Sequence, residues 1–366
     1  MRVTGIHVGL AASFVLLGAG QAASPAAGLK VTVGQPRTIS SSATAEGQHL
    51  FPALWRLRDG TLLLDYHIEG DIDPARRACL RSVDNGQTWT PDPPRVYRED
   101  SVVQLSDGTV LGYDDYTLSV APGSKQSKGV MFRSRDGGKT FEGPIEVIVN
   151  MLRASREPSP NPNYQYSMLF WRSILELPDG SLLASLYGWW AGDAKWRSVA
   201  AISKDKGLTF DYLSTVGYDP ALGEGYNESV FCWTRAGDIL CMMRNGSGTG
   251  QALRQARSTN YGRTWSKPEI VGADSVDPDL VLMSNGVLAC SYGRPGCWIM
   301  FDPTGTGRKW QKPIQVFGGG STCYTGIREI APGRLLYVYD ATNFDDGSGH
   351  GPANCLRAVE ITVERQ

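Results

Sequence analysis

The sequence has no excess of charge of either sign. Its 366 residues include 36 Lys and Arg and 37 Asp and Glu, so the formal net charge is −1 at pH 7. Proteins that bind nucleic acid usually carry a basic patch that contacts the phosphate backbone. A near-neutral chain therefore gives no electrostatic reason to expect DNA or RNA as a partner.

Long apolar runs are confined to the N-terminus. Arg2 precedes an apolar stretch over 8–19, and small residues follow at 20–27. The stretch is too short for a good membrane span, and the pattern predicts a signal peptide over 1–23; the alternative is a mildly apolar, unstructured N-terminus. We expect a mature protein over 24–366 that is secreted or periplasmic, monomeric and without a membrane span.

The cysteine and histidine motifs of metal sites are also missing. The seven cysteines and four histidines form no CxxC pair and no Cys/His cluster, which argues against a zinc site. No motif indicates a cofactor. An odd number of cysteines leaves at least one thiol unpaired in an exported protein. The others could form disulfides or lie as small buried thiols on strands.

The clearest feature present is a motif that occurs four times, S-x-D-x-G-x-T-[W/F]. Its Asp, which is Asn260 in the last copy, can accept hydrogen bonds from its own turn. Its Gly supplies the positive φ of a tight turn, and the aromatic residue packs behind the turn. The copies span 82–89, 134–141, 203–210 and 258–265.

A second repeat surrounds the first. Two apolar stretches flank a Gly-containing turn, which is the pattern of a β-hairpin. A degenerate copy of the first motif follows the fifth hairpin at 301–310. The six hairpin turns lie at 59–60, 107–108, 179–180, 237–238, 285–286 and 332–333.

The four-fold motif resembles the Asp-box, or BNR repeat, of the sialidase superfamily. The resemblance implies an all-β fold, a six-bladed β-propeller, with one hairpin in each blade and the Asp-boxes on outer strands away from the active site. No composition shift marks a second domain, so we expect one propeller domain over 24–366. The segment near 29–39 is expected to complete the last blade.

Equivalent positions on the inner strands should converge on the propeller axis, and they are rich in ionisable and aromatic residues. Charge at such a place costs desolvation unless it is paired or used. The starts of the first strands give Pro52, Asp100, Arg172, Glu228, Asp277 and Tyr324. The ends of the second strands give Tyr66, His67, Tyr116, Tyr187, Arg244, Arg294 and Asp340.

The resemblance to sialidases assigns roles to some of these residues. In that family a tyrosine on the last blade is the nucleophile and a glutamate activates it; Tyr324 and Glu228 match them. A phenol has a pKa near ~10 and needs a base at neutral pH. The general acid is an aspartate after the first hairpin, for which Asp73 and then Asp71 are the candidates.

The family also clamps the substrate carboxylate with three arginines, and this chain matches only two. Arg244 and Arg294 occupy two of the positions, and a guanidinium suits bidentate binding of a carboxylate. Leu50 stands where the third arginine belongs, and Arg172, Arg76 or Arg77 could replace it. The departure argues against ordinary sialic acid hydrolysis.

Structural roles compete with the functional ones. Tyr324 could be a packing residue, Glu228 and Arg244 a structural ion pair, and Asp277 a turn cap. Trp189, Trp190 and Trp196 could form a sugar-stacking platform or ordinary packing. The residues expected to bind substrate are Arg244, Arg294, Arg172, Asp100, Asp277, His67, Tyr116 and Trp189.

The preferred interpretation is an exo-glycoside hydrolase, sialidase-like, that removes a terminal acidic or deoxy sugar from a glycan substrate. The first alternative is a lyase or an α-L-rhamnosidase-type propeller acting on uronate-containing glycans, for which His67, Tyr66, His49 and His350 offer proton-transfer groups. The second is a glycan-binding propeller without catalysis, because fold alone does not establish function.

Overall fold

The computed structural model describes residues 28–70, 77–92, 101–114, 116–156, 167–246 and 250–366. Every regular element in these ranges is a β-strand, so the predicted all-β class is confirmed. No helix in the described ranges is long and apolar enough to cross a membrane. The predicted signal peptide and the candidates Asp71, Asp73 and Asp100 lie outside the described residues.

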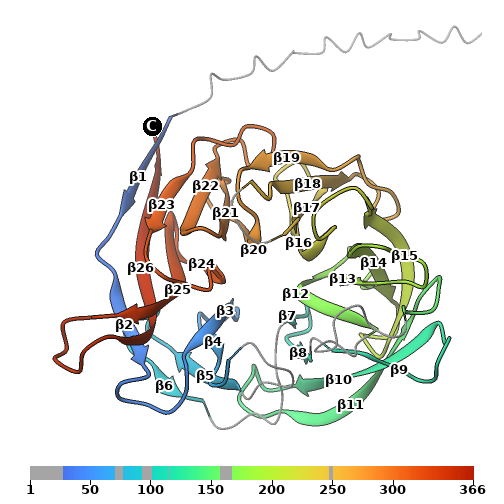
Figure 1. The fold of residues 1–366 in the computed structure, drawn as a ribbon, viewed down its shortest axis with the longest axis horizontal. Helices are drawn as coiled ribbons and strands as arrows, with labels where there is room; N and C mark the ends of the chain where they lie inside the picture. Colours follow the sequence, from blue (N-terminus) through green and yellow to red (C-terminus); the bar gives the residue numbers. More distant parts are fainter. Residues whose placement is uncertain (1–27, 71–76, 93–100, 115, 157–166, 247–249) are drawn as a thin grey trace, which may run out of the picture.

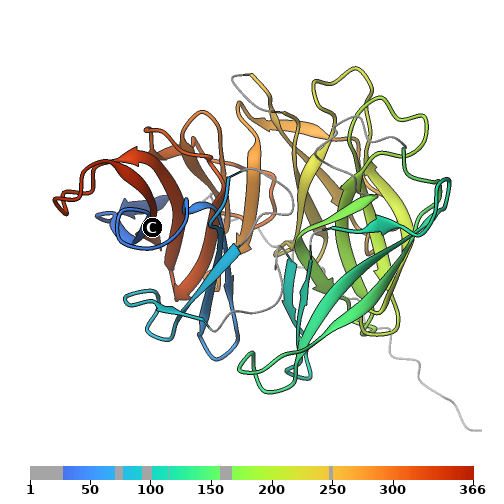
Figure 2. The same ribbon diagram turned by 60° about the horizontal axis from the view of Figure 1, so that its bottom comes forward.

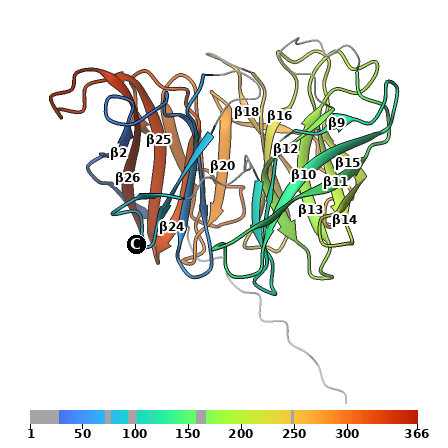
Figure 3. The ribbon, with the colours of Figure 1, turned by 90° about the horizontal axis from the view of Figure 1, so that it is seen from below.

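The strands form a ring around a central axis, and hairpins line its inner side (Figure 1). Seen from the side, β12, β16 and β20 run along the axis (Figure 3). Six antiparallel hairpins lie at the predicted places. They are β3 (Leu50–Arg56) with β4 (Leu62–His67), β7 (Ser101–Gln104) with β8 (Val110–Tyr113), β12 (Met168–Glu176) with β13 (Leu182–Gly188), β16 (Asn227–Trp233) with β17 (Ile239–Arg244), β20 (Val276–Leu282) with β21 (Leu288–Gly293), and β24 (Thr325–Ala331) with β25 (Arg334–Phe344).

Further strands lie outside the hairpins, and each Asp-box joins two of them, as predicted. They are β5 (Arg77–Ser82), β6 (Thr90–Pro91), β9 (Leu118–Ser119), β10 (Gln126–Ser134), β11 (Glu142–Asn150), β14 (Arg197–Ser203), β15 (Thr209–Gly217), β18 (Leu253–Ser258), β19 (Glu269–Gly272), β22 (Cys297–Asp302) and β23 (Ile314–Phe317).

Hydrogen bonding divides the described strands into five sheets. Three have four strands each, β3 to β6, β16 to β19 and β20 to β23, and a five-stranded sheet contains the C-terminus. A nine-stranded sheet runs from β11 through β15 and β12 to β9. Within it β12 meets β7 at one parallel pair, Arg172 with Ser101. Because β10 also pairs with β11, eight of its strands form a closed circuit.

The ring is closed by the two ends of the described chain. β1 (Leu29–Val33) and β2 (Arg37–Ser41) both pair antiparallel with β26 (Ala353–Arg365). Figure 2 shows this blue N-terminal segment beside the red C-terminal strands. The prediction that the segment near 29–39 completes the last sheet is confirmed.

The Asp-boxes satisfy their own turns and also pack against the neighbouring sheet. In the second copy Ser134 Oγ accepts the Gly138 N–H at 2.8 Å, and Asp136 accepts the Thr140 N–H at 2.9 Å. Gly138 has a positive φ of 81°, and a Cβ there would lie 2.9 Å from Leu57 of the preceding sheet. Glycine is therefore required both by the backbone and by the close approach.

The degenerate copy keeps the same function with different spacing. Asp302 accepts hydrogen bonds from the backbone N–H groups of Arg308 at 2.9 Å and Lys309 at 3.2 Å.

The core itself lies between the sheets and is built from apolar side chains of the strands. All seven cysteines are free thiols, and of the two alternatives, disulfides or small buried thiols on strands, the second holds for Cys241, Cys290, Cys297 and Cys355.

Candidate active site

Four inner strands share an unusual backbone conformation, near the start of β3, β16 and β20 and in the middle of β12. Phe51, Arg172, Glu228 and Asp277 have positive φ values of 53°, 48°, 40° and 47°. Each lies where the strand register shifts at a β-bulge. A bulge redirects a side chain, and a left-handed non-glycine residue costs about 1–3 kcal/mol. Such conformations cluster at functional sites, and here they recur in four different hairpins around the axis.

Tyr324 and Glu228 meet across the ring, as predicted. The Tyr324 hydroxyl donates to Glu228 Oε1 at 2.5 Å, although the two residues are 96 positions apart. The same oxygen accepts a hydrogen bond from Arg244 Nη1, and Glu228 Oε2 accepts the Asp277 N–H at 2.9 Å. Glu228 is only 3% exposed. Both carboxylate oxygens are therefore held in fixed directions, one of them toward the phenol.

The surroundings keep the Tyr324 phenol protonated. Burial, followed by the nearby Glu228 carboxylate, raises the pKa of Tyr324 well above its ordinary range, and the Arg244 guanidinium opposes the shift. Arg244 Nη1 also lies 3.4 Å from the phenol oxygen. A neutral phenol needs a base to become a nucleophile, and Glu228 Oε1 is already in position to accept its proton.

A second ion cluster lies directly beside this group. Arg172 binds Asp277 through Nε at 2.8 Å and through Nη2, and its Nη1 lies 3.6 Å from Asp279. Asp279 also binds Arg328 Nη1 at 2.6 Å. Burial raises the pKa of Asp277, while Arg172 lowers it. Asp277 is thus no simple turn cap, since it joins Arg172 to the Thr325 N–H at 3.1 Å.

Hydrogen bonds to Asp340 hold the segment before Tyr324 in place. Asp340 lies on β25 and is fully buried. Its carboxylate accepts the Thr322 N–H at 2.9 Å and the Phe51 N–H at 3.1 Å. Arg294 Nη2 donates to the Thr322 carbonyl at 2.5 Å. The expected clamp residue Arg294 therefore lies against the backbone that carries Tyr324.

Aromatic rings continue from Tyr324 across the axis to β12 and β13 of the nine-stranded sheet. Tyr324 contacts Trp171 with ring centroids 6.2 Å apart, Trp171 contacts Tyr187 at 5.5 Å, and Tyr187 contacts Trp196 at 5.1 Å. Tyr116 packs against the same cluster. On its other edge Tyr324 meets Phe51 at 4.8 Å. We call the series Tyr324, Trp171, Tyr187 and Trp196 the aromatic wall.

The three candidate platform tryptophans differ in their environments. Trp190 belongs to the core, where it contacts Tyr212. Trp189 is 9% exposed and stacks on Trp196, which is partly exposed. Trp196 is therefore the member of this group with the most accessible ring, and Trp189 supports it from behind.

The predicted residues fall into three groups in the structure. Tyr324, Glu228, Arg244, Arg172 and Asp277 form one connected cluster. Other candidates lie at its edges: Arg294 at the Thr322 backbone, His67 against Phe51, Tyr116 in the aromatic cluster and Trp189 behind Trp196. Asp71, Asp73 and Asp100 lie outside the described ranges.

Three acidic residues of the cluster have no assigned role in the sequence-based expectations. Asp340 was expected near the axis but without a function, and Asp279 was visible as a charge within an apolar strand, which is the signal that could have marked it. Glu224, 3.4 Å from Arg244 Nη2, lies in an irregular segment before β16, and no sequence pattern distinguishes it from a solvated loop residue.

The comparisons with known proteins agree with this architecture. The sequence pattern of the BNR repeat-like domain matches residues 101–315, more than half of the chain. The chain belongs to the BNR repeat-like domain family. The resemblance seen in its Asp-boxes is thereby confirmed. The search of curated proteins found no match to this chain.

Solved structures of similar fold are remote in sequence. A Dyadobacter fermentans protein of unknown function has 22% identity and a TM-score of 0.70, covering 91% of this chain and 99% of that one. A Hadza microbial sialidase has 17% identity and a TM-score of 0.64, and the match covers 90% of this chain and 68% of that one. A Penicillium chrysogenum α-L-arabinanase complexed with arabinobiose has 17% identity and a TM-score of 0.63, and the match covers 91% of this chain and 98% of that one. At these identities the likeness concerns the propeller-like fold alone.

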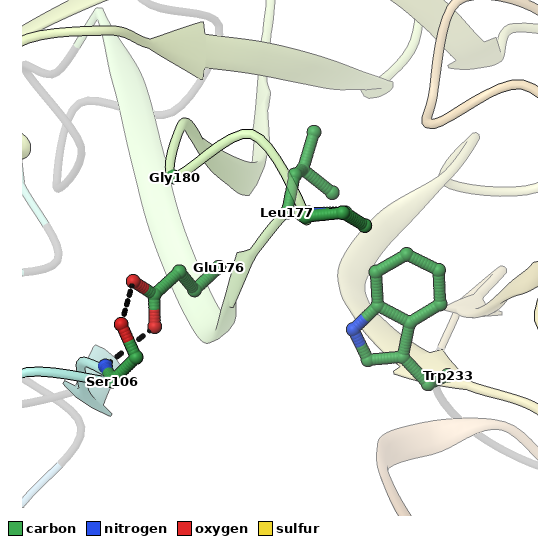
Figure 4. Close-up of a pocket in the computed structure, with 6 residues that line it drawn as sticks. Ser106, Glu176, Leu177, Gly180 and Trp233 are labelled. Carbon is green, nitrogen blue, oxygen red and sulfur yellow. Dashed lines mark hydrogen bonds between the residues drawn. The ribbon is translucent and has the colours of Figure 1, made fainter.

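A cavity of about 430 Å³ lies at the opposite, hairpin-turn end of the inner strands (Figure 4). Its lining includes Glu176, Leu177 and Trp233. Glu176 accepts hydrogen bonds from the N–H and hydroxyl of Ser106 at 2.6 and 2.7 Å. Glu329 binds Ser284 in the same way elsewhere in the ring. The repeated contact indicates that Glu176 joins neighbouring hairpins.

Proposed function

We propose that this BNR repeat-like protein is a glycoside hydrolase that removes a terminal sugar from a glycan, with Tyr324 as nucleophile and Glu228 as its base. The observation that carries the proposal is the 2.5 Å hydrogen bond from the Tyr324 hydroxyl to Glu228 Oε1. Tyrosine nucleophiles are a recognised exception to the usual pair of carboxylates in glycosidases. The glycoside hydrolases among the structural neighbours support a carbohydrate-active propeller.

The proposed reaction has two steps. Glu228 Oε1 takes the phenol proton while the Tyr324 oxygen attacks the anomeric carbon and the glycosidic bond breaks. The leaving oxygen receives a proton from a general acid, for which Asp73 or Asp71 is proposed. Water then attacks the anomeric carbon of the glycosyl-tyrosine and gives its proton to the aspartate that acted as general acid, Glu228 returns its proton to the phenol oxygen, and the free sugar leaves.

Arg244 has a positioning and electrostatic role in this scheme. It binds Glu228 Oε1 and lies 3.4 Å from the phenol oxygen. A guanidinium there favours the negative charge that moves from the carboxylate to the phenol oxygen during attack. The ion pair of Arg244 and Glu228 therefore serves the proposed chemistry as well as joining the neighbouring strands β16 and β17.

We extend the proposal to the architecture and the location. Six hairpins around the axis support six blades, with the nine-stranded sheet divided into two blades where β7 and β12 share one residue pair.

Residues 1–23 are proposed as a signal peptide that directs a secreted or periplasmic protein. Sequencing the N-terminus of the exported protein tests this, and a mature chain that begins at Met1 would contradict it.

The test of function is product release from a panel of neutral and acidic glycosides by the wild type, Tyr324→Phe and Tyr337→Phe. Tyr337 is a matched control, because its buried hydroxyl donates to the Trp298 carbonyl, away from Glu228. We expect one monosaccharide to be released by the wild type and Tyr337→Phe, and a loss of ~10³-fold or more in Tyr324→Phe.

Two results would overturn the hydrolase proposal. An unsaturated product that absorbs in the near ultraviolet would identify a lyase. Binding of glycans without any turnover would identify a glycan-binding propeller.

A further inference from the structure

We propose that the sugar bound at this site is uncharged, so that the substrate is a neutral glycoside. This inference rests on the proposed function and names its substrate class. It is drawn from the pairing of charges around Tyr324, from Leu50 and from the aromatic wall. It narrows the sequence-based expectation of an acidic or deoxy sugar.

The guanidinium nearest the phenol is already between two carboxylates. Arg244 binds Glu228 Oε1 through Nη1 and lies 3.4 Å from Glu224 Oε2 through Nη2. A substrate carboxylate that used this guanidinium would have to lie close to both glutamates. Like charges at such distances repel one another strongly in a partly buried site. Arg244 therefore stabilises the protein's own anions.

The second central guanidinium is matched in the same way. Arg172 is chelated by Asp277 and lies near Asp279, which also binds Arg328. Arg172 and Asp277 are both buried. Removing Arg172 from Asp277 to serve a substrate would leave a buried carboxylate without compensation. Arg172 thus does not replace the missing clamp arginine.

The position of the missing arginine is apolar in the structure. Leu50 is 9% exposed and pairs with His67 on the adjacent strand. The following residue, Phe51, gives its N–H to the buried Asp340 carboxylate. Within the described part of the chain the central cluster has five carboxylates and four guanidinium groups: Glu224, Glu228, Asp277, Asp279 and Asp340 against Arg172, Arg244, Arg294 and Arg328. Arg172, Arg244 and Arg328 thus each have a carboxylate partner within the protein itself.

The aromatic wall offers what a neutral sugar needs. Aromatic rings pack against the C–H face of a sugar, and a few polar groups fix its orientation. Trp171 and Tyr187 are buried, whereas Tyr324 and Trp196 are partly exposed. Tyr324 and Trp196 are therefore the two members of the aromatic wall against which a sugar can pack.

The deciding experiment uses pairs of 4-nitrophenyl glycosides that differ only in a neutral CH₂OH or a carboxylate at C5, together with pentosides, 6-deoxyhexosides and an α-sialoside. We expect kcat/KM for neutral members to exceed that for acidic ones by about 100-fold or more, and the ratio to fall as salt screens the repulsion. Acidic members that react equally well or better would overturn the inference.

The same pairs separate this inference from the hydrolase proposal. If no glycoside is hydrolysed, the proposed function fails, and calorimetry with neutral and uronic disaccharides then tests the inference by binding alone. Binding of the neutral members with at least tenfold preference supports it. Preference for the uronic members, or no binding of neutral ones at millimolar concentration, contradicts it.

Variants test the physical cause. Leu50→Arg adds the missing cation and should shift the acidic-to-neutral ratio of kcat/KM upward by about tenfold or more; Leu50→Met, the apolar control, should leave the ratio unchanged. If Leu50→Arg does not fold, Glu224→Gln removes a carboxylate whose side chain is 40% exposed, and the same direction is expected. An unchanged ratio in the folded variant would refute the electrostatic explanation.

Discussion

The Asp-box turns and the bulges of the inner strands both recur around the ring, but the boxes repeat side chains and the bulges repeat a backbone conformation. In the boxes the side chains recur: Ser134 and Ser203 make the same 2.8 Å bond to the box glycine. In the bulges the backbone recurs while the side chains change, from Arg172 to Glu228 to Asp277. The repeated side chains of the Asp-boxes at the rim build a scaffold, and the different side chains of the bulges at the axis build one asymmetric site.

The energetic consequences of the two repeats are opposite. A box satisfies its own backbone donors and packs its glycine on the neighbouring sheet, so it stabilises the fold locally. A bulge holds a non-glycine residue at positive φ and a charge in a buried place, both of which cost stability. Substitutions at the boxes should therefore affect folding alone, and those at the bulges should affect function or break a buried charge pair.

The largest effect is expected for Glu228→Gln. The amide keeps the shape of the side chain but cannot take the phenol proton, so kcat/KM should fall by about 10²–10⁴-fold. The matched control is Glu329→Gln, because Glu329 is also bonded through both oxygens but at the hairpin-turn end. Kinetics on the glycoside that the wild type hydrolyses would measure both. A loss of less than tenfold in Glu228→Gln would contradict the role of base.

A large loss of stability is expected for Arg172→Met. This change leaves the fully buried Asp277 carboxylate unpaired, which typically costs about 3–5 kcal/mol. Urea unfolding measures it. The double variant Arg172→Met/Asp277→Asn removes the stranded charge and should be more stable than the single one. Equal stability of the wild type and Arg172→Met would show that the pair is not formed.

A smaller loss of stability, without loss of activity, is expected for Ser134→Ala. The buried Gly138 N–H loses its acceptor, which costs about 1–3 kcal/mol. Denaturant unfolding and kcat/KM should be measured on the same preparation. Reduced activity per folded molecule would break the distinction between rim and axis.

The smallest effect is a pH dependence from Asp84. Hydrogen bonds from the Thr88 side chain and backbone, with Ser82, lower the pKa of Asp84 to about 2, whereas an unfolded aspartate titrates near ~3.9. The stabilisation is therefore complete above about pH 4 and is lost as the pH falls through about 2. Asp84→Asn lacks this titration, so its stability difference from the wild type should shrink over that range. A constant difference would contradict the assignment.

The scaffold could be predicted from the sequence because its determinants are local. Each Asp-box and each hairpin turn lies within about ten residues, and turn chemistry acts over that distance. The pairing of β1 and β2 with β26 followed from the need to complete the last sheet. The contact of Tyr324 with Glu228 was predicted from the family resemblance, since nothing local connects residues 96 positions apart.

The charge pairing at the axis could not be predicted. Arg172 and Asp277 are 105 residues apart, and either could have faced a substrate. Which partner an arginine takes depends on the relative placement of whole sheets and on the bulges that redirect the side chains. The three tryptophans were ambiguous for the same reason: Trp190 is a core residue and Trp196 is not, although both follow the same strand.

The most direct test of Tyr324 as nucleophile is mass spectrometry of the protein after reaction with a 2-deoxy-2-fluoro derivative of its activated substrate. Fluorine at C2 slows both formation and breakdown of a glycosyl-enzyme, and a good leaving group allows the first step. We expect one fluoroglycosyl group on the peptide that contains Tyr324 and none in Tyr324→Phe. A label on Glu228 or another residue, or release of the leaving group without any covalent label, would contradict the mechanism.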